Sequence, residues 1–189
     1  MDETKTVKRY IGIDPGSRGA IAIIDDNDNV LHLADIDSDI RTYWYYIVFI
    51  ANQDFSREYY GAVEDVCGRP GQSCKANTTF MKLAGYAELV TYLFAKDVEH
   101  YMPVKPQVWK KHFGLISHGL TKTERKHLSI EKAKELYPQV ADRLTPSKDG
   151  RAEALLIARY CRDVINNKLT TYSMYQSGCQ DTTISKASL

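Results

Sequence analysis

The sequence lacks paired cysteines and long apolar runs, and its charges almost cancel. Its four cysteines form no C-x-x-C pair, which argues against a zinc site of the usual ligand spacing and is typical of reduced thiols inside a cell. No run of about 18 apolar residues occurs, so no membrane span is expected. The polar, acidic N-terminus does not resemble a secretory signal. These absences predict a soluble, intracellular protein.

The composition is that of one ordinary globular domain. The chain has 189 residues, of which 43% are hydrophobic and 26% are charged, and this length is sufficient for a buried core. The region after Asn166 is rich in Thr, Ser and Gln and has little apolar content. We therefore expect a single domain over residues 1–166 and a mobile tail over residues 167–189.

The formal net charge is only +1, but the charges are unevenly distributed. Residues 25–65 contain ten acidic residues and two basic ones, whereas residues 101–139 contain eight Lys and Arg residues and three Glu residues. A chain polarised in this way can present a basic face to phosphate groups in spite of a near-neutral sum. A solvated helix surface would account for the same pattern, so the charges alone do not identify a partner.

Short apolar segments that alternate with helical patterns predict an α/β fold. Apolar, β-branched segments bounded by turns predict strands over residues 7–14, 19–25, 30–36, 59–66 and 98–104. Helical patterns predict helices over about residues 37–53, 75–96, 106–114, 122–136 and 148–165. The first three strands read as an antiparallel meander. The fourth, reached across a helix, is expected to lie beside the first and parallel to it.

Two of the predicted strands end near carboxylates. Asp14 ends the apolar strand of residues 7–14 just before a Pro-Gly turn, and Glu64 lies near the end of the fourth strand. Ligands of open α/β sheets bind where the chain direction switches, outside the carboxyl ends of the strands, so Asp14 and Glu64 are expected to face each other there. Taken alone, Asp14 fits equally well as an Asx-turn residue that binds nearby backbone amides.

A second pair of carboxylates begins the last predicted helix. Asp149 and Glu153 are four residues apart and project from one face of that helix. Singly, Asp149 could cap the helix, and Glu153 could pair with Arg151 or Lys148. Four carboxylates brought together repel one another unless cations hold them. Two divalent ions about 4 Å apart would do so and would suit phosphodiester hydrolysis, and hard oxygen ligands favour Mg²⁺ or Mn²⁺.

Three segments in this order resemble the RuvC family of Holliday-junction resolvases, most closely its phage-type members: residues 11–16 (IGIDPG), 63–65 (VED) and 149–158 (DGRAEALLIA). The resemblance covers about residues 8–165. It implies an RNase H-like fold, with a five-stranded mixed sheet of order 3-2-1-4-5 flanked by helices. It also implies a homodimer that cuts four-way DNA junctions by metal-dependent, paired hydrolysis. The residues that match the family's acidic positions are Asp14, Glu64, Asp149 and Glu153.

One departure concerns the last helix. Bacterial members of the family usually carry two Asp residues three apart there, whereas this chain has an Asp and a Glu four apart. Both spacings share a helical face, so both residues are kept as candidate ligands. Which of Asp149 and Glu153 is the main metal ligand stays open.

The resemblance further implies a dimer interface and a DNA-binding surface. The helix at residues 75–96 corresponds to the family's dimer helix, with ordinary core packing as the alternative. Aromatic residues at 43–46, Phe80 and Tyr86 are candidates to wedge into a junction, although aromatics on apolar helix faces are more often core residues. The candidate DNA contacts are Arg69, Lys75, Lys105, Lys110, Lys122 and Arg151.

Three other functions fit part of the pattern. A nuclease of the same fold would use the same metal site on flap or other branched DNA, or on RNA. An ATPase of the actin and sugar-kinase type also opens with a strand, an Asp and a Gly turn, but it needs a second such lobe, for which 189 residues leave no room. A non-catalytic junction-binding dimer has no reason to gather acidic residues against DNA.

Overall fold

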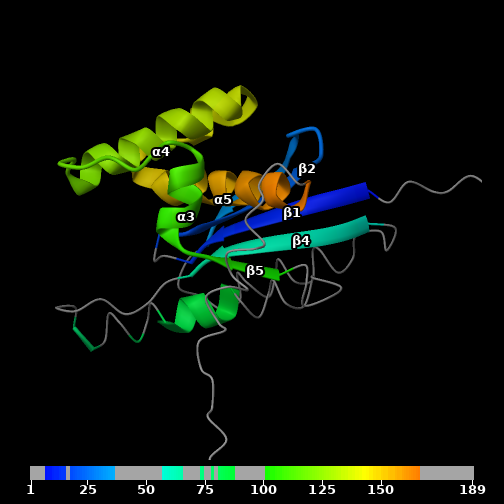
Figure 1. Cartoon of the computed structure of the whole chain (residues 1–189), viewed down its shortest axis with the longest axis horizontal. Coiled ribbons are helices and arrows are strands. Elements are labelled where there is room, and N and C mark those ends of the chain that lie inside the picture. The colour runs from blue at the N-terminus through cyan, green and yellow to red at the C-terminus, as the bar shows by residue number, and fades with distance from the viewer. Residues whose placement is uncertain are drawn as a thin grey trace, which may run out of the picture.

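A computed structural model describes residues 7–15, 18–36, 57–65, 73–74, 78, 81–87 and 101–166. Its strands are β1 (Val7–Asp14), β2 (Ala20–Asp25), β3 (Val30–Asp35), β4 (Arg57–Glu64) and β5 (Tyr101–Val104). They form one mixed sheet in the order β3-β2-β1-β4-β5 (Figure 1). The meander β1-β2-β3 is antiparallel, and β4 is parallel to both β1 and β5. This is the RNase H-like topology, so the predicted fold class and strand order are confirmed.

Helices cover both faces of the sheet. On one face lies α5 (Asp149–Ile165), with α3 (Pro106–His112) and α4 (Lys122–Leu136) beside it (Figure 1). A helical segment at residues 81–87 packs on the other face. The bounds of α3, α4 and α5 agree with the predicted helices. Two short 3-10 segments that the sequence pattern did not predict join α4 to α5, namely η2 (Pro138–Arg143) and η3 (Pro146–Lys148).

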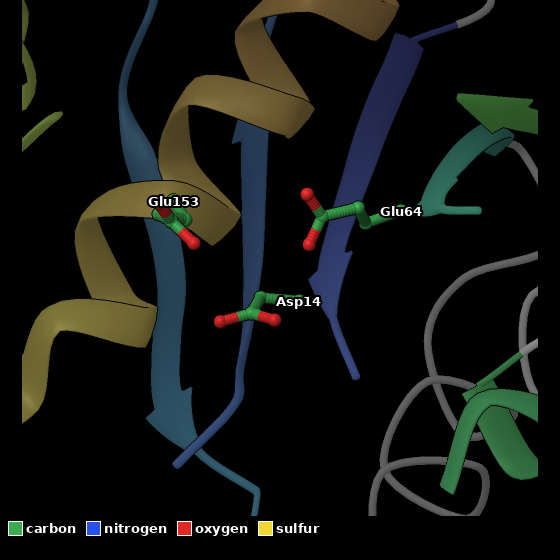
Figure 2. Close-up of side chains that lie close together, drawn as sticks. All are labelled: Asp14, Glu64 and Glu153. Atoms are coloured by element: carbon green, nitrogen blue, oxygen red, sulfur yellow. The ribbon is translucent and has the colours of Figure 1, made fainter. Parts of the chain in front are cut away.

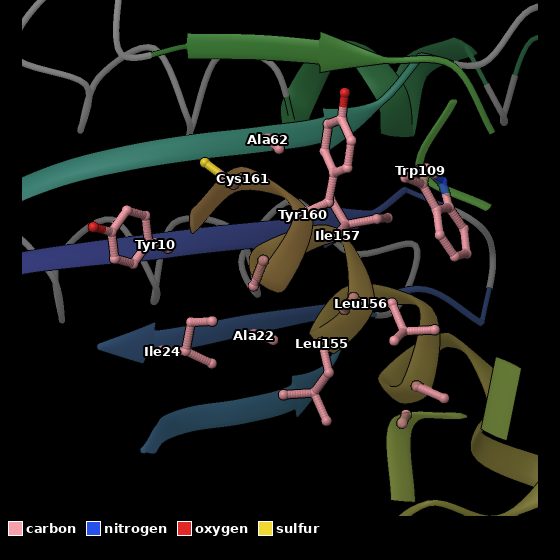
Figure 3. Close-up of a cluster of buried hydrophobic side chains, with 14 of the residues drawn as sticks. Tyr10, Ala22, Ile24, Ala62, Trp109, Leu155, Leu156, Ile157, Tyr160 and Cys161 are labelled. Carbon is pink, nitrogen blue, oxygen red and sulfur yellow. The ribbon is translucent and has the colours of Figure 1, made fainter. Parts of the chain in front are cut away.

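The alternation of side chains along β1 explains why this strand is apolar on both sides. Ile11 and Ile13 belong to the core beneath residues 81–87, together with Leu83. Tyr10 belongs to the core beneath α5 (Figure 3). Successive residues of a strand point to opposite faces, so Gly12 and Asp14 share the α5 face with Tyr10.

Gly12 allows α5 to lie directly on β1. A Cβ at this position would be 2.2 Å from the carbonyl oxygen of Ala154 and 2.2 Å from the backbone nitrogen of Ala158. Both of these partners are backbone atoms of α5, and both residues have small side chains. The close approach of this helix to β1 therefore needs a residue without a side chain at position 12.

Local signals set the bounds of α3 and α4. Pro106 occupies the start of α3, and Gly114, at φ 69°, follows its end, where the left-handed region favours glycine. Thr121 and Glu124 form a capping box at the start of α4: the Thr121 side chain accepts from the Glu124 amide, and the Glu124 carboxylate accepts from the Thr121 amide. Helix α4 therefore begins at Lys122, as predicted.

Several predictions lie outside the described residues and stay predictions. These predictions concern the helix at 37–53 with its aromatic cluster, most of the helix at 75–96 with Phe80, the loop that carries Arg69, the residue Lys75 and the tail at 167–189.

Within the described ranges, no helix is long and apolar enough to cross a membrane.

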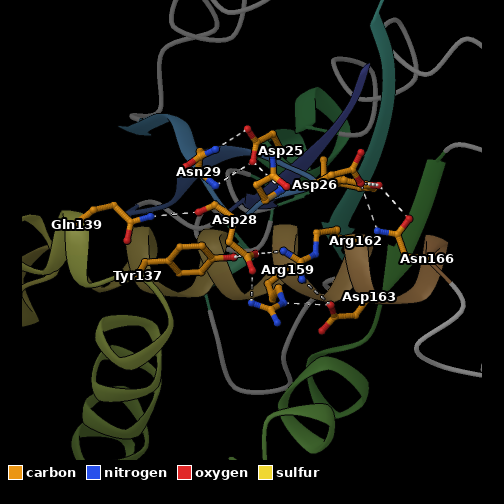
Figure 4. Close-up of polar contacts among 12 residues, drawn as sticks. Asp25, Asp26, Asp28, Asn29, Tyr137, Gln139, Arg159, Arg162, Asp163 and Asn166 are labelled. Atoms are coloured by element: carbon orange, nitrogen blue, oxygen red, sulfur yellow. Dashed lines mark hydrogen bonds and ion pairs between the residues drawn. The ribbon is translucent and has the colours of Figure 1, made fainter. Parts of the chain in front are cut away.

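A polar network ties the second half of α5 to the β2–β3 turn (Figure 4). Asp28, at φ 64° in this turn, accepts from Arg159 Nη1 at 2.9 Å and pairs with Arg162. Asp163 pairs with Arg159 Nε at 3.0 Å and with His112 Nε2 of α3 at 3.0 Å. Because Arg162 and Asp163 are almost fully buried, these pairs fix the position of α5 over the sheet.

The acid stability of the protein is expected to depend on Asp163. Burial raises the pKa of this carboxyl, but the bonds and charges of His112, Arg159 and Arg162 outweigh burial and leave the pKa below its ordinary value. The unfolded chain therefore binds this proton more readily than the folded one. The stabilisation is present above a pH of about 4 and is lost as the pH falls below that value.

We expect Asp163→Asn to lower the free energy of unfolding at neutral pH and to make its decrease in acid shallower than in the wild type. Urea unfolding at neutral pH and at several acid pH values measures both effects. Asp142→Asn is the control, since Asp142 is an exposed carboxylate of η2. An acid profile of Asp163→Asn that matches the wild type would contradict the assignment.

Candidate metal centre

Asp14 and Glu64 are the last residues of two neighbouring parallel strands. Ile13 of β1 is in register with Val63 of β4. The next residue of each strand is the carboxylate, and both strands run in the same direction, so the two carboxylates lie at the same edge of the sheet. Period-2 alternation also directs both side chains to the face covered by α5.

Glu153 of α5 completes a cluster of three carboxylates (Figure 2). One oxygen of each of Asp14, Glu64 and Glu153 lies within 4.8 Å of the others. Glu64 is 7% exposed, and Asp14 and Glu153 are half-buried. The predicted approach of the two strand carboxylates is observed, and the third ligand atom comes from the second turn of the helix.

This cluster can hold a divalent cation. Three carboxylates at such short range repel one another, and burial increases the free-energy cost of that repulsion. Lys110 Nζ of α3 lies 3.1 Å from Glu153 Oε1 and neutralises part of the charge. Carboxylate oxygens are the ligands that Mg²⁺ and Mn²⁺ prefer, so the donor set suits either ion.

Asp149 lies outside this three-residue cluster. It is the first residue of α5, where Lys148 rather than Asp149 holds the N-cap position. The Asp149 carboxylate is ion-paired with Lys126 of α4. Its Oδ1 atom is buried and has no hydrogen-bond partner among the described residues. A buried carboxylate oxygen without a donor is costly, and a cation beside it would remove that cost. The role of Asp149 as a metal ligand stays a prediction.

Gly150 brings the β1–β2 turn close to the start of α5. A Cβ on Gly150 would be 2.1 Å from the carbonyl oxygen of Arg18 and 3.1 Å from Asp14 Oδ2. The Asp14 carboxylate therefore lies against Gly150, a residue of the first turn of α5 that lies between Asp149 and Glu153 in the sequence. A side chain at position 150 would clash with the Arg18 carbonyl and press on the Asp14 carboxylate.

The predicted basic residues have different surroundings. Lys105 and Lys122 are exposed, at the N-cap of α3 and the first turn of α4. Lys110 contacts the acidic cluster through Glu153. The Arg151 guanidinium binds both oxygens of Asp35, at 2.7 and 3.0 Å, so Arg151 pairs with neither Glu153 nor Asp149. The structure leaves the DNA contacts untested. Arg69 and Lys75 lie outside the described residues.

Sequence reasoning did not single out Lys126 or Arg18. Lys126 counted only as one cation of the basic segment, and Arg18 only as part of a turn. A signal for Lys126 was present, because Lys122 and Lys126 are four residues apart and share a helical face. The direction of that face depends on how α4 packs on α5, which no local pattern gives.

We expect Lys110→Ala to strengthen the binding of Mn²⁺ to the cluster about fivefold. The Lys110 ammonium competes with a metal ion for Glu153, and a partly exposed ion pair of this kind is worth up to ~1 kcal/mol. Isothermal titration calorimetry with Mn²⁺ alone measures the affinity. Lys111→Ala, at the exposed neighbouring position, should leave it unchanged. Equal or weaker Mn²⁺ binding in Lys110→Ala would contradict the competition.

The fold and the cluster together define the class of this protein. It is an α/β protein of RNase H-like topology, with an acidic cluster at the carboxyl ends of the two central parallel strands. Such a cluster suits metal-dependent hydrolysis or nucleotidyl transfer. No protein-family model matches the chain, and no curated protein matches it either.

Proposed function

We propose that this chain is a metal-dependent endonuclease that resolves four-way (Holliday) DNA junctions. One observation carries the nuclease part of the proposal: Asp14, Glu64 and Glu153 converge at the edge of an RNase H-like sheet. The choice of a junction as substrate rests on the RuvC-like segments around these same residues. Paired cuts on opposite strands require a homodimer.

Mg²⁺ or Mn²⁺ is the proposed cofactor, with two ions per site. Asp14, Glu64 and Glu153 would hold the first ion, and Asp149 would supply the unpartnered Oδ1 to the second beside Asp14. Bound there, the metal would supply an activated water molecule and would stabilise the leaving oxygen of the phosphodiester. Of the three carboxylates, Glu64 is the most shielded from solvent, at 7% exposure.

Lys110 has a positioning role in this proposal. Its ammonium lies over the Trp109 ring, 4.8 Å from the ring centroid, and 3.1 Å from Glu153. The Trp109 side chain is fully buried and fixed, so Lys110 is held at the rim of the acidic cluster. A cation at this place would attract the phosphodiester to be hydrolysed, because it offsets the repulsion between phosphate and carboxylates.

The proposed dimer uses the helix predicted at residues 75–96. In its described part, Leu83 and Ala87 are buried against the sheet. Met81 is 48% exposed on the opposite side, and Lys82 and Gly85 are exposed with it. A single exposed Met is ordinary on a protein surface, so the proposal of a dimer through this helix rests on the RuvC resemblance.

The deciding experiment compares cleavage of a synthetic four-way junction with cleavage of linear duplex, flap and three-way DNA, and of RNA, in Mg²⁺ or Mn²⁺. Symmetric paired nicks in the junction alone are the expected result. Equal or better cutting of flap, three-way or RNA substrates would make the protein a nuclease of the same fold with a different substrate. Junction binding without cutting of any substrate would overturn the enzymatic proposal and leave a junction-binding dimer.

A further inference from the structure

A basic cavity lies beside the metal centre, on its α4 side. It measures about 260 Å³, and its lining comes from the N-terminal half of α4, the β1–β2 turn and η3. No carboxylate lines it within the described residues. The lining residues are Arg18, Lys122, Thr123, Lys126, His127, Ile130 and Pro146.

The cations of this cavity are largely unneutralised. Arg18 and Lys122 have no carboxylate partner among the described residues, and Lys126 has Asp149. The nearest acidic residue along α4 is Glu124, and its carboxylate folds back onto the Thr121 backbone and hydroxyl at 2.7 Å. Cations gathered in one cavity repel one another, so the cavity is set up to take an anion.

The start of α4 adds to the positive potential. This helix has 15 residues, and the partial positive charge of its N-terminus favours an anion near its first turn. Lys122 and Thr123 belong to that turn and line the cavity. The Lys122 ammonium and the positive end of α4 therefore both attract an anion into this cavity.

The cavity and the acidic cluster are linked through the first turn of α5. Lys126 lines the cavity and also contacts Asp149. Arg18 lines the cavity, and its carbonyl oxygen and Asp14 Oδ2 both lie close to Gly150 in the first turn of α5. The acidic cluster and the cavity therefore meet at the first turn of α5.

We infer that this cavity binds an uncleaved backbone phosphate of the nucleic-acid strand that the metal centre cuts. The inference rests on the proposed nuclease function and adds a subsite to it. Lys122 and Arg18 supply the charge-assisted hydrogen bonds, and the contact fixes the register of the strand without reading its sequence. Lys126 is shared between this phosphate and Asp149.

The test measures binding of a four-way junction to the full chain in metal-free buffer, so that no cleavage occurs. Lys122→Ala and Arg18→Ala are each expected to weaken binding about five- to tenfold at moderate salt and to reduce the salt slope by about one unit. Lys134→Ala is the matched control, because Lys134 lies on the same helix, pairs with Glu131 and does not line the cavity. Thermal unfolding of each variant confirms that it is folded.

A methylphosphonate scan identifies the phosphate. Replacing one phosphate at a time by a neutral methylphosphonate should weaken wild-type binding at one position near the cut site, and this loss should vanish in Lys122→Ala. Wild-type binding by both cavity variants, or a loss that persists in Lys122→Ala, would overturn the inference. Calorimetric binding of inorganic phosphate with junction binding unchanged in the variants would assign the cavity to free phosphate and overturn it too. The binding assays contain no metal, so their results do not depend on cleavage. Failure of the wild type to cleave in a separate assay with metal would count against the proposed nuclease function and not against the phosphate subsite.

Discussion

Asp14→Asn is expected to abolish metal-dependent cleavage, with a fall in kcat of about a thousandfold or more. Asp14 belongs to the cluster with Glu64 and Glu153, and its Oδ2 atom lies close to Gly150 in the first turn of α5. It is therefore the carboxylate best placed to serve both of the proposed metal positions. Stabilisation by bound metal is worth several kcal/mol, and each 1.36 kcal/mol is about tenfold in rate. Asn removes the charge and keeps the size of the side chain, so folding should be retained.

Three measurements on Asp14→Asn separate these effects. Junction cleavage in Mg²⁺ gives the rate, calorimetry with Mn²⁺ gives the loss of metal binding, and junction binding without metal should stay within about twofold of the wild type. Asp65→Asn is the control, because Asp65 is an exposed carboxylate next to Glu64 and lies outside the cluster. Cleavage by Asp14→Asn within tenfold of the wild type would show that the cluster is not the catalytic centre.

Gly12→Ala is expected to cause a large loss of stability for a change of one methyl group. The new Cβ would be 2.2 Å from two backbone atoms of α5, in Ala154 and Ala158, and 2.8 Å from the Cα of Ala158. Backbone atoms have no alternative rotamer, so α5 has to move away from β1. Overpacking typically costs 1–3 kcal/mol and occasionally more, and here we expect about 3 kcal/mol or more. Because α5 carries Glu153, metal binding should weaken as well.

The stability effect is measured by urea unfolding and the metal effect by calorimetry with Mn²⁺. Gly85→Ala is the matched control. Gly85 is helical and exposed, and a Cβ there has no atom within 4 Å, so the change should stabilise the protein by about 0.5–1 kcal/mol. A free energy of unfolding for Gly12→Ala within 1 kcal/mol of the wild type would contradict the packing argument.

The sequence predicted most of the sheet because its signals are local. Strand β1 and its turn are marked by β-branched residues and a Pro-Gly pair, and a helix-length interval before β4 favours a parallel partner. The meeting of Asp14 and Glu64 follows from these two facts alone, since parallel neighbours end at the same edge. The helix α5 was equally clear from its apolar pattern and its acidic start.

The environment of the α5 carboxylates was not predictable in the same way. Asp149 and Glu153 share a helical face, yet in the structure Glu153 joins the cluster and Asp149 pairs with Lys126. The difference arises from the packing of α3 and α4, which bring Lys110 and Lys126 from segments distant in sequence. Arg151 was a candidate DNA contact, and its bond to Asp35 depends on the β3 edge lying beside α5. Such contacts follow from tertiary packing and have no local sequence signal.

The two lysines at the α5 carboxylates have a consequence for the folding of the metal-free chain. Lys110 and Lys126 act as built-in counter-ions for Glu153 and Asp149, so the acidic edge of the sheet can assemble before any ion arrives. A chelator should then abolish the proposed metal-dependent cleavage without unfolding the protein. A metal ion bound at the unpartnered Oδ1 of Asp149 would weaken the pull of this carboxylate on Lys126, and Lys126 would then bind a phosphate more strongly. Loading of metal and capture of nucleic acid are thereby expected to favour each other.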